Sequence, residues 1–199
     1  MRRALIVIDY TNDFVADDGP LTCGKPAQAL EGRISELITE FIDDPDAFVV
    51  IANDCHPPEN EYHPERRAGH TPHMIPGTAG RELYGEVGRT VKMLESRLSP
   101  RDRTRLHRVD KVRFGAFPGT DLELFLRERG VTELHLAGVC TDICVLHTAV
   151  DAYNKGFDLV IHVDAVQSFD PAGHEWALRH FKNLLNARLM RGGREIDAL

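Results

Sequence analysis

The sequence contains no long hydrophobic run. The apolar run near the N-terminus, residues 4–8, is too short for the hydrophobic region of a signal peptide and far too short to cross a bilayer. No other stretch of the sequence reaches the length of a membrane span. Internal repeats, linkers and low-complexity segments are also missing. These features predict one domain over residues 1–199, located in the cytoplasm and without a membrane partner.

The sequence also has few cysteines and fewer basic than acidic side chains. Without a secretory signal, the four cysteines are expected to be free thiols rather than a disulfide framework. The chain has 31 acidic and 24 basic side chains, and its formal net charge is −7. Because nucleic-acid phosphates and anionic membrane surfaces bind basic faces, this charge argues against both as partners. The 42% of hydrophobic residues still suffices for a sizeable core.

Apolar strands alternate with amphipathic helices along the chain. Continuous runs rich in Ile and Val, typical of strands buried on both faces, cover residues 4–8, 48–52, 133–137 and 158–163, with weaker candidates at 106–109 and 188–190. Apolar residues recur at helical spacing in residues 27–42, 122–129, 141–153 and 173–185. This alternation predicts a three-layer α/β/α fold with a mainly parallel, Rossmann-like central sheet.

Reactive side chains follow several of the predicted strands. In an open α/β sheet, ligands bind beyond the carboxyl ends of the strands. We therefore expect residues that are distant in sequence to meet at one rim of the sheet. The candidates at this rim are Asp9, Asp54, His56, Lys111 and the segment 140–144.

Cys144 is the candidate nucleophile. It follows a predicted strand and a short turn, so it is expected in the first turn of a helix, where free N–H groups and the helix dipole stabilise a thiolate. The alternative is a structural cysteine, since free cysteine is among the most buried residue types. Asp9 and Lys111, expected at neighbouring strand ends, favour catalysis because they would place a proton acceptor and a positive charge beside the thiol.

Carboxylates and imidazoles crowd one segment of about twenty residues. Asp-x-His followed by Glu and His suits a borderline divalent ion such as Zn²⁺, Mn²⁺ or Fe²⁺. The alternative is a solvated loop that is rich in histidine. The surrounding segment, residues 55–80, is too long for an idle connection and is expected to be functional. The candidate ligands are Asp54, His56, His63, Glu65, His70 and His73.

Taken together, these segments resemble the nicotinamidases of the isochorismatase-like cysteine hydrolase superfamily from end to end. The most specific segment is Gly-Val-Cys-Thr-Asp-Ile-Cys-Val-Leu-His-Thr-Ala-Val-Asp-Ala at residues 138–152, which contains Cys144. The resemblance is also carried by residues 4–14, 54–56, 63–65, 72–78 and 111–117.

The resemblance implies roles for individual residues. It implies that Asp9, Lys111 and Cys144 form a catalytic triad. It implies a non-proline cis peptide bond between Val139 and Cys140, which would direct the backbone N–H groups of Cys140 and Cys144 at one oxyanion. The resemblance further implies one divalent metal ion, Zn²⁺ in preference to Mn²⁺ or Fe²⁺. Its implied ligands are Asp54, His56, Glu65 and His73, with His63 as the rival to Glu65.

The resemblance also implies a substrate pocket. Phe14 and Phe114 are its candidate walls, and core packing is the alternative for both. Ala68 departs from the pattern, because relatives carry a large apolar or aromatic side chain there.

The implied activity is hydrolysis of nicotinamide to nicotinate and ammonia through a thioester, in NAD salvage, with pyrazinamide as a further substrate. The ring nitrogen of the amide would bind the metal ion, and a homo-oligomer is compatible with this activity. One alternative is a related cysteine amidase for a carbamoyl or ureido compound, against which the metal cluster argues. The other is a non-catalytic metal-binding relative, against which the intact triad argues.

Overall fold

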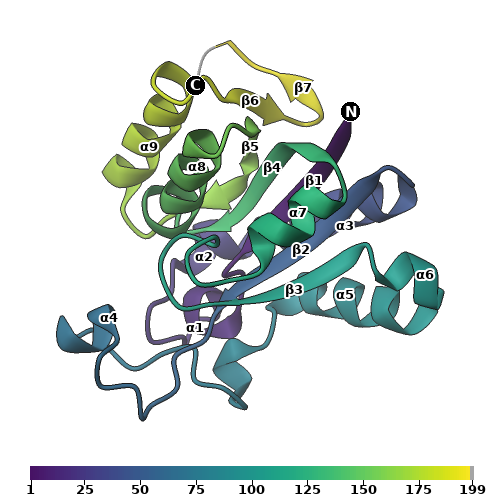
Figure 1. The fold of residues 1–199 in the computed structure, drawn as a ribbon. Coiled ribbons are helices and arrows are strands. Elements are labelled where there is room, and N and C mark those ends of the chain that lie inside the picture. Colours follow the sequence, from purple (N-terminus) through teal and green to yellow (C-terminus); the bar gives the residue numbers. More distant parts are fainter. Residues whose placement is uncertain (198–199) are drawn as a thin grey trace.

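The computed structural model describes residues 1–197 and has a seven-stranded sheet between two layers of helices (Figure 1). The strand order is β3-β2-β1-β4-β5-β6-β7, and neighbours are parallel except β6 and β7. This arrangement confirms the predicted three-layer fold. The strands are β1 (Arg2–Ile8), β2 (Ala47–Asp54), β3 (Leu106–Lys111), β4 (Val131–Val139), β5 (Asp158–Gln167), β6 (Arg188–Arg191) and β7 (Arg194–Glu195).

Helices cover both faces of the sheet. One face carries α3 (Glu31–Asp43) and α5 (Gly85–Arg97), and the other carries α7 (Leu122–Glu128), α8 (Leu146–Asn154) and α9 (Pro171–Asn183) (Figure 1). The shorter elements are α1 (Asn12–Val15), α2 (Gly24–Gln28), α4 (Pro64–Arg67), η1 (Ala79–Arg81), α6 (Pro100–Arg103) and the π-helical turn η2 (Thr141–Val145). Among residues 1–197, none of the helices has the length and apolar character needed to cross a membrane.

The alternation of side chains along the central strands explains the two helical layers. Leu5 and Val7 of β1 pack in the core beneath α3 and α5, whereas Ile6 and Ile8 pack beneath α7, α8 and α9. All four side chains are fully buried. Because β1 is covered on both faces, its sequence is a continuous apolar run rather than an alternating one.

The helices differ from the sequence pattern in two places. The helix predicted over 27–42 is divided into α2 and α3, because a tight turn at Leu30, whose N–H donates to the carbonyl of Ala27 at 3.1 Å, interrupts it. The sequence pattern does not reveal α5. Its apolar residues are separated by charged side chains and by Gly85 and Gly88, which lower the apparent helix propensity.

The strand order places a topological switch between β1 and β4. From β1 the chain runs through β2 to β3 at one edge, and it then returns to add β4 on the other side of β1. Connections therefore leave the carboxyl ends of β1 and β4 in opposite directions, which opens a crevice there. The two strands approach closely, since a Cβ on Gly138 would lie 2.0 Å from the carbonyl oxygen of Ile8.

Candidate active site

Three charged side chains meet at the carboxyl ends of β1, β2 and β3. Lys111 Nζ lies 2.7 Å from Asp9 Oδ2 and 2.7 Å from Asp54 Oδ1. The backbone N–H of Asp54 also donates to Asp9 Oδ1 at 2.7 Å. The sequence-based expectation that Asp9 and Lys111 lie at neighbouring strand ends is wrong, because β2 separates β1 from β3. The long lysine side chain spans the intervening strand and joins both carboxylates.

Asp9 leaves its strand in an unusual backbone conformation. Its φ of +51° lies in the left-handed region, which Asp tolerates better than most side chains. The N–H of Asp9 still donates to the carbonyl of Ala52 in the sheet, whereas its own carbonyl already accepts from the N–H of Thr11 at 2.8 Å. The chain thus turns at this residue, at the point where the carboxylate meets Lys111.

Cys144 lies in the first turn of the helical segment formed by η2 and α8, as the sequence pattern predicts, but this turn is π-helical rather than α-helical. The turn is wider than an α-helix because the N–H of Val145 donates to the carbonyl of Cys140, five residues earlier, at 3.1 Å. Cys144 Sγ lies within 4.8 Å of a carboxylate oxygen of Asp9 and of one of Asp54. The expected cis peptide bond between Val139 and Cys140 is present.

The electrostatics of this cluster favour a neutral thiol in the resting state. Burial raises the pKa of Cys144 well above its usual value, and Lys111 only partly offsets the effect. This outcome differs from the thiolate expected at a helix N-terminus, because burial and the nearby carboxylates of Asp9 and Asp54 favour the neutral thiol. Burial also raises the pKa of Asp9, to about 6, with a further contribution from Asp54. Asp9 can therefore take up a proton near neutral pH.

Lys111 remains a cation in these surroundings. Burial alone would lower the pKa of Lys111, but Asp9, Cys144 and Asp54 raise it well above its usual value. Burial would likewise raise the pKa of Asp54, but Lys111 and His56 outweigh burial and lower it. The positive charge of Lys111 thus reduces the repulsion between the nearby carboxylates of Asp9 and Asp54.

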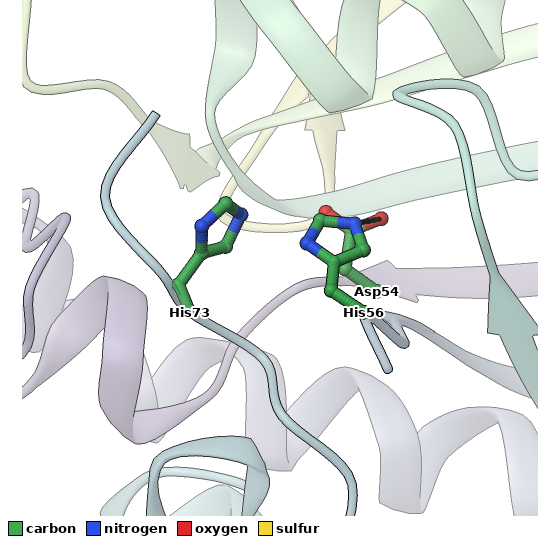
Figure 2. Close-up of side chains that lie close together, drawn as sticks. All are labelled: Asp54, His56 and His73. Carbon is green, nitrogen blue, oxygen red and sulfur yellow. Dashed lines mark ion pairs between the residues drawn. The ribbon is translucent and has the colours of Figure 1, made fainter. Parts of the chain in front are cut away.

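A second cluster of side chains adjoins the first at Asp54. The side chains of Asp54, His56 and His73 converge (Figure 2), and one ligand atom of each lies within 4.8 Å of the others. The same holds for the group His56, His63 and Glu65. The structure thus brings all the expected ligands, and the rival His63, into one region.

Glu65 and His63 contact this cluster differently. Glu65 Oε2 lies 3.3 Å from His73 Nε2, and Glu65 Oε1 lies 3.7 Å from His56 Nε2. His63 Nε2 lies 2.8 Å from the carbonyl oxygen of Val112 and must be the donor, because a carbonyl only accepts. Only the other ring nitrogen of His63 is then free to bind a metal ion.

The donor set fits a divalent metal ion. His56 Nε2 is buried and has no hydrogen-bond partner within residues 1–197. His73 Nδ1 donates to the carbonyl of Thr71 at 2.7 Å, which leaves Nε2 with its lone pair. Donor atoms in the cluster lie 3.3–3.7 Å apart. About 3.4 Å is the separation expected for tetrahedral ligands with bonds of about 2.1 Å to Zn²⁺.

A cavity of about 360 Å³ joins the two clusters. Phe14 and Phe114, the expected walls, both line it together with Cys144. Sequence patterns do not reveal three further lining residues, Leu21, Ile143 and Phe169. Ala68 ends α4 on the protein surface and lies outside the lining, so no side chain from this position forms a wall.

The protein-family model described as the Isochorismatase domain matches residues 3–191. The chain belongs to the isochorismatase family. Within this family, it is similar to the crystal structure of nicotinamidase/pyrazinamidase from Bacillus subtilis, with 53% identity and a TM-score of 0.88. That match covers 95% of this chain and 99% of the Bacillus chain.

Two further isochorismatase-family structures are informative. The pyrazinamidase/nicotinamidase of Streptococcus mutans is 44% identical, with a TM-score of 0.87, and the match covers 94% of this chain and 99% of that chain. The pyrazinamidase of Pyrococcus horikoshii, solved in complex with zinc, is 27% identical, with a TM-score of 0.78. That match covers 96% of this chain and 99% of that chain.

Proposed function

We propose that this chain hydrolyses nicotinamide to nicotinate and ammonia, and pyrazinamide likewise, in a cytoplasmic pathway of NAD salvage. The observation that carries the proposal is the shared cavity. Cys144, with Asp9 and Lys111 behind it, opens into the same space as Asp54, Glu65 and His73. The likeness to the Bacillus and Streptococcus nicotinamidases supports the choice of substrate, and the free thiols support a reducing compartment.

Attack on the amide uses the buried triad. As Cys144 Sγ bonds to the carbonyl carbon, its proton passes to Asp9, whose raised pKa suits a group that accepts a proton and later returns it. Lys111, 2.7 Å from Asp9 Oδ2, keeps that carboxylate ionised until the proton arrives. The backbone N–H groups of Cys140 and Cys144 receive the oxyanion, and each such donor typically contributes about 2.7–4 kcal/mol.

Collapse of the tetrahedral intermediate releases ammonia. Asp9 returns its proton to the departing nitrogen, and the acyl group remains on Cys144 as a thioester. Water then attacks the thioester carbonyl while Asp9 accepts a proton from it. The acid product leaves, and Cys144 recovers its proton from Asp9, so that the triad ends as it began.

Asp54, His56, Glu65 and His73 would hold one divalent ion. The unpartnered Nε2 of His56 and the 3.3–3.7 Å separations support a metal site, and the zinc complex of the Pyrococcus relative supports Zn²⁺. When bound, the ion supplies a Lewis-acid contact for a ring nitrogen of the substrate. Phe14 and Phe114 would enclose the aromatic ring, because both line the cavity beside Cys144.

The test is ammonia release from nicotinamide, pyrazinamide, benzamide and an N-carbamoyl amino acid, with and without a chelator. We expect the first two to be hydrolysed and benzamide to have a kcat/KM at least about 100-fold lower, because it lacks the ring nitrogen. Chelation should depress the first two far more than benzamide. Equal cleavage of benzamide would contradict the orienting role of the metal. Cleavage of the carbamoyl compound alone would replace the proposed function with that of a carbamoyl amidase.

A further inference from the structure

Two cysteine side chains touch each other beside the nucleophile turn. Cys23 Sγ and Cys140 Sγ lie 3.3 Å apart, although 117 residues separate them in the sequence. Both are free thiols, and both are 5% exposed. The hydrolytic steps above use neither side chain, since Cys140 contributes only its backbone N–H. The contact is therefore a chemical feature for which the proposed function has no use.

The pair connects two segments that each contribute a residue to the cavity lining. Cys23 immediately precedes α2, and its N–H donates to the carbonyl of Phe14 at 2.8 Å. Cys140 ends β4, lines the cavity itself, and accepts the N–H of Val145 on its carbonyl. A covalent bond between the two sulfurs would thus tie the segment that carries Phe14 to the turn that carries Cys144.

We propose that Cys23 and Cys140 form a redox-modification site, in which a hydroperoxide converts the two thiols to a disulfide and thereby lowers hydrolytic activity. A thiol reductant reverses the change. The 3.3 Å contact carries the proposal, because it places a second thiol in position to attack the first as soon as that one is oxidised.

The chemistry balances with one peroxide per pair. The sulfur of Cys140, a residue that lines the cavity, attacks a peroxide oxygen, so that an S–O bond forms, the O–O bond breaks and, with hydrogen peroxide, water departs with the thiol proton. Cys23 then attacks the oxidised sulfur, forming the S–S bond and expelling the second water with its own proton. Two thiols are oxidised by two electrons, and one peroxide is reduced to two waters.

The modification requires a substantial local movement. A disulfide bond is about 2.05 Å long, so the sulfurs must approach by more than 1 Å from their 3.3 Å contact. This shift would move Cys140, whose backbone N–H is directed at the oxyanion. Misplacement of catalytic groups by about 1 Å can cost about 100-fold in rate. We therefore expect the oxidised chain to lose at least tenfold in kcat/KM.

The contact with Cys23 and burial both raise the pKa of Cys140, which keeps it a thiol. Because the thiolate is the nucleophile, the pair should react more slowly than an exposed cysteine. The disulfide is thus expected under elevated peroxide and not in ordinary turnover.

The first experiment identifies the bond. The Cys144→Ala chain is treated with hydrogen peroxide, its remaining thiols are alkylated, and the digest is mapped by mass spectrometry without reduction. We expect one cross-linked peptide pair joining Cys23 and Cys140, which disappears in a Cys23→Ser variant and persists in the matched control Cys55→Ser. Absence of this cross-link, or a bond from Cys140 to Cys144 in the chain that retains the nucleophile, would overturn the inference.

The second experiment measures the effect on activity, and this part rests on the proposed function. Each chain is treated with peroxide and then with dithiothreitol, and amide hydrolysis is measured after each step. In the unmodified sequence, dithiothreitol should raise the rate at least tenfold above that of the oxidised chain. In Cys23→Ser and Cys23→Ala the rise should be much smaller, because these variants cannot form the disulfide that the reductant would break. Equal recovery in all three would overturn the claim that the disulfide lowers activity. A chain that hydrolyses no amide before oxidation would instead overturn the proposed function, and the cross-link would still be tested by mass.

Discussion

The two halves of the candidate site are built in different ways. The nucleophile half, defined as Asp9, Lys111 and Cys144, comes from the ends of strands and the turn after β4, and its three side chains are at most 5% exposed. The metal half, His56, Glu65 and His73, lies in the connection from β2 to α5, which contains little regular structure. Register in a parallel sheet positions the first half, whereas individual hydrogen bonds must position the second.

Hydrogen bonds at Met74 show how the loop is held. The N–H of Met74 donates to Asp13 Oδ2 at 2.6 Å, and its carbonyl accepts the N–H of His56 at 3.1 Å. Met74, next to His73, thus ties the loop to α1 through Asp13. It also ties the end of the loop that carries His73 to the end that carries His56. Asp54 joins the halves, because its Oδ1 lies 2.7 Å from Lys111 Nζ and 3.6 Å from Nε2 of the proposed ligand His56. The sheet thus positions the nucleophile half, whereas hydrogen bonds within the loop and to α1 position the metal half.

The largest expected effect is in the nucleophile half. Cys144→Ala should reduce amide hydrolysis by at least about 10⁴-fold, because no other group in the cavity replaces the nucleophile. The chain should remain folded, since a small buried truncation costs only a few kcal/mol of unfolding free energy. Ammonia release and circular dichroism measure the two outcomes. A folded variant with near-normal turnover would refute the role of Cys144.

The next effect separates the ligands of the metal half. Glu65→Ala should weaken metal binding by about 100-fold or more, because Glu65 faces both His56 and His73. His63→Ala should weaken it less, since one ring nitrogen of His63 is bound to the Val112 carbonyl. Metal content after dialysis against graded chelator measures both. Full retention of metal in both variants would show that the ligand set is wrong, and the reverse ranking would make His63 the ligand.

Sequence reasoning succeeds for the nucleophile half for a physical reason. Apolar runs such as residues 4–8 mark buried strands, and the carboxyl ends of parallel strands share an edge, so Asp9, Lys111 and the turn at Cys144 can be placed at one rim. The order of strands in a sheet cannot be determined from local sequence patterns. The position of β2 between β1 and β3 is therefore not predicted. The π-helical width of the turn is not predicted either, because residues 141–153 have ordinary helical periodicity.

The metal half shows where a sequence pattern is insufficient. Loop ligands have no periodicity, so His63 and Glu65 cannot be separated without coordinates. The cavity walls are harder still, because Leu21, Ile143 and Phe169 come from three unrelated segments that only long-range packing brings together. A weak signal for Phe169 is its position two residues before Pro171, but the predicted strand ends at residue 163, and nothing in the sequence places Phe169 at the cavity.

The pH dependence of kcat/KM should distinguish the two halves, with an expected loss of about tenfold one pH unit below the pKa of Asp9. Asp9 must be a carboxylate to accept the proton of Cys144, and burial raises its pKa to about 6. Below that pH the protonated fraction grows, so kcat/KM should fall by about tenfold per pH unit. Metal content measured at each pH shows whether the metal half is still intact. A profile that stays flat down to pH 5 with full metal content would contradict the role assigned to Asp9.

The smallest expected effect concerns Phe169, which belongs to neither half. Its side chain is 59% exposed and lies on the connection between β5 and α9, at the lining of the cavity. The connection is anchored on both sides, because Ser168 Oγ donates to Asp142 Oδ1 at 2.6 Å and Asp170 Oδ1 accepts the N–H of Ala172 at 3.0 Å. An exposed phenyl ring held at a cavity in this way can be covered by a bound substrate at little entropic cost.

Phe169→Ala should therefore raise KM with kcat unchanged, because the ring would contact substrate and transition state equally. Covering roughly 40 Å² of the ring contributes about 1 kcal/mol, which corresponds to about a fivefold change in KM. Trp176→Ala is the matched control, since Trp176 is 49% exposed on α9 but lies outside the cavity lining. If both variants shift KM alike, the effect does not come from contact with substrate in the cavity. If only Phe169→Ala shifts it, Phe169 is a further wall of the substrate pocket beside Phe14 and Phe114.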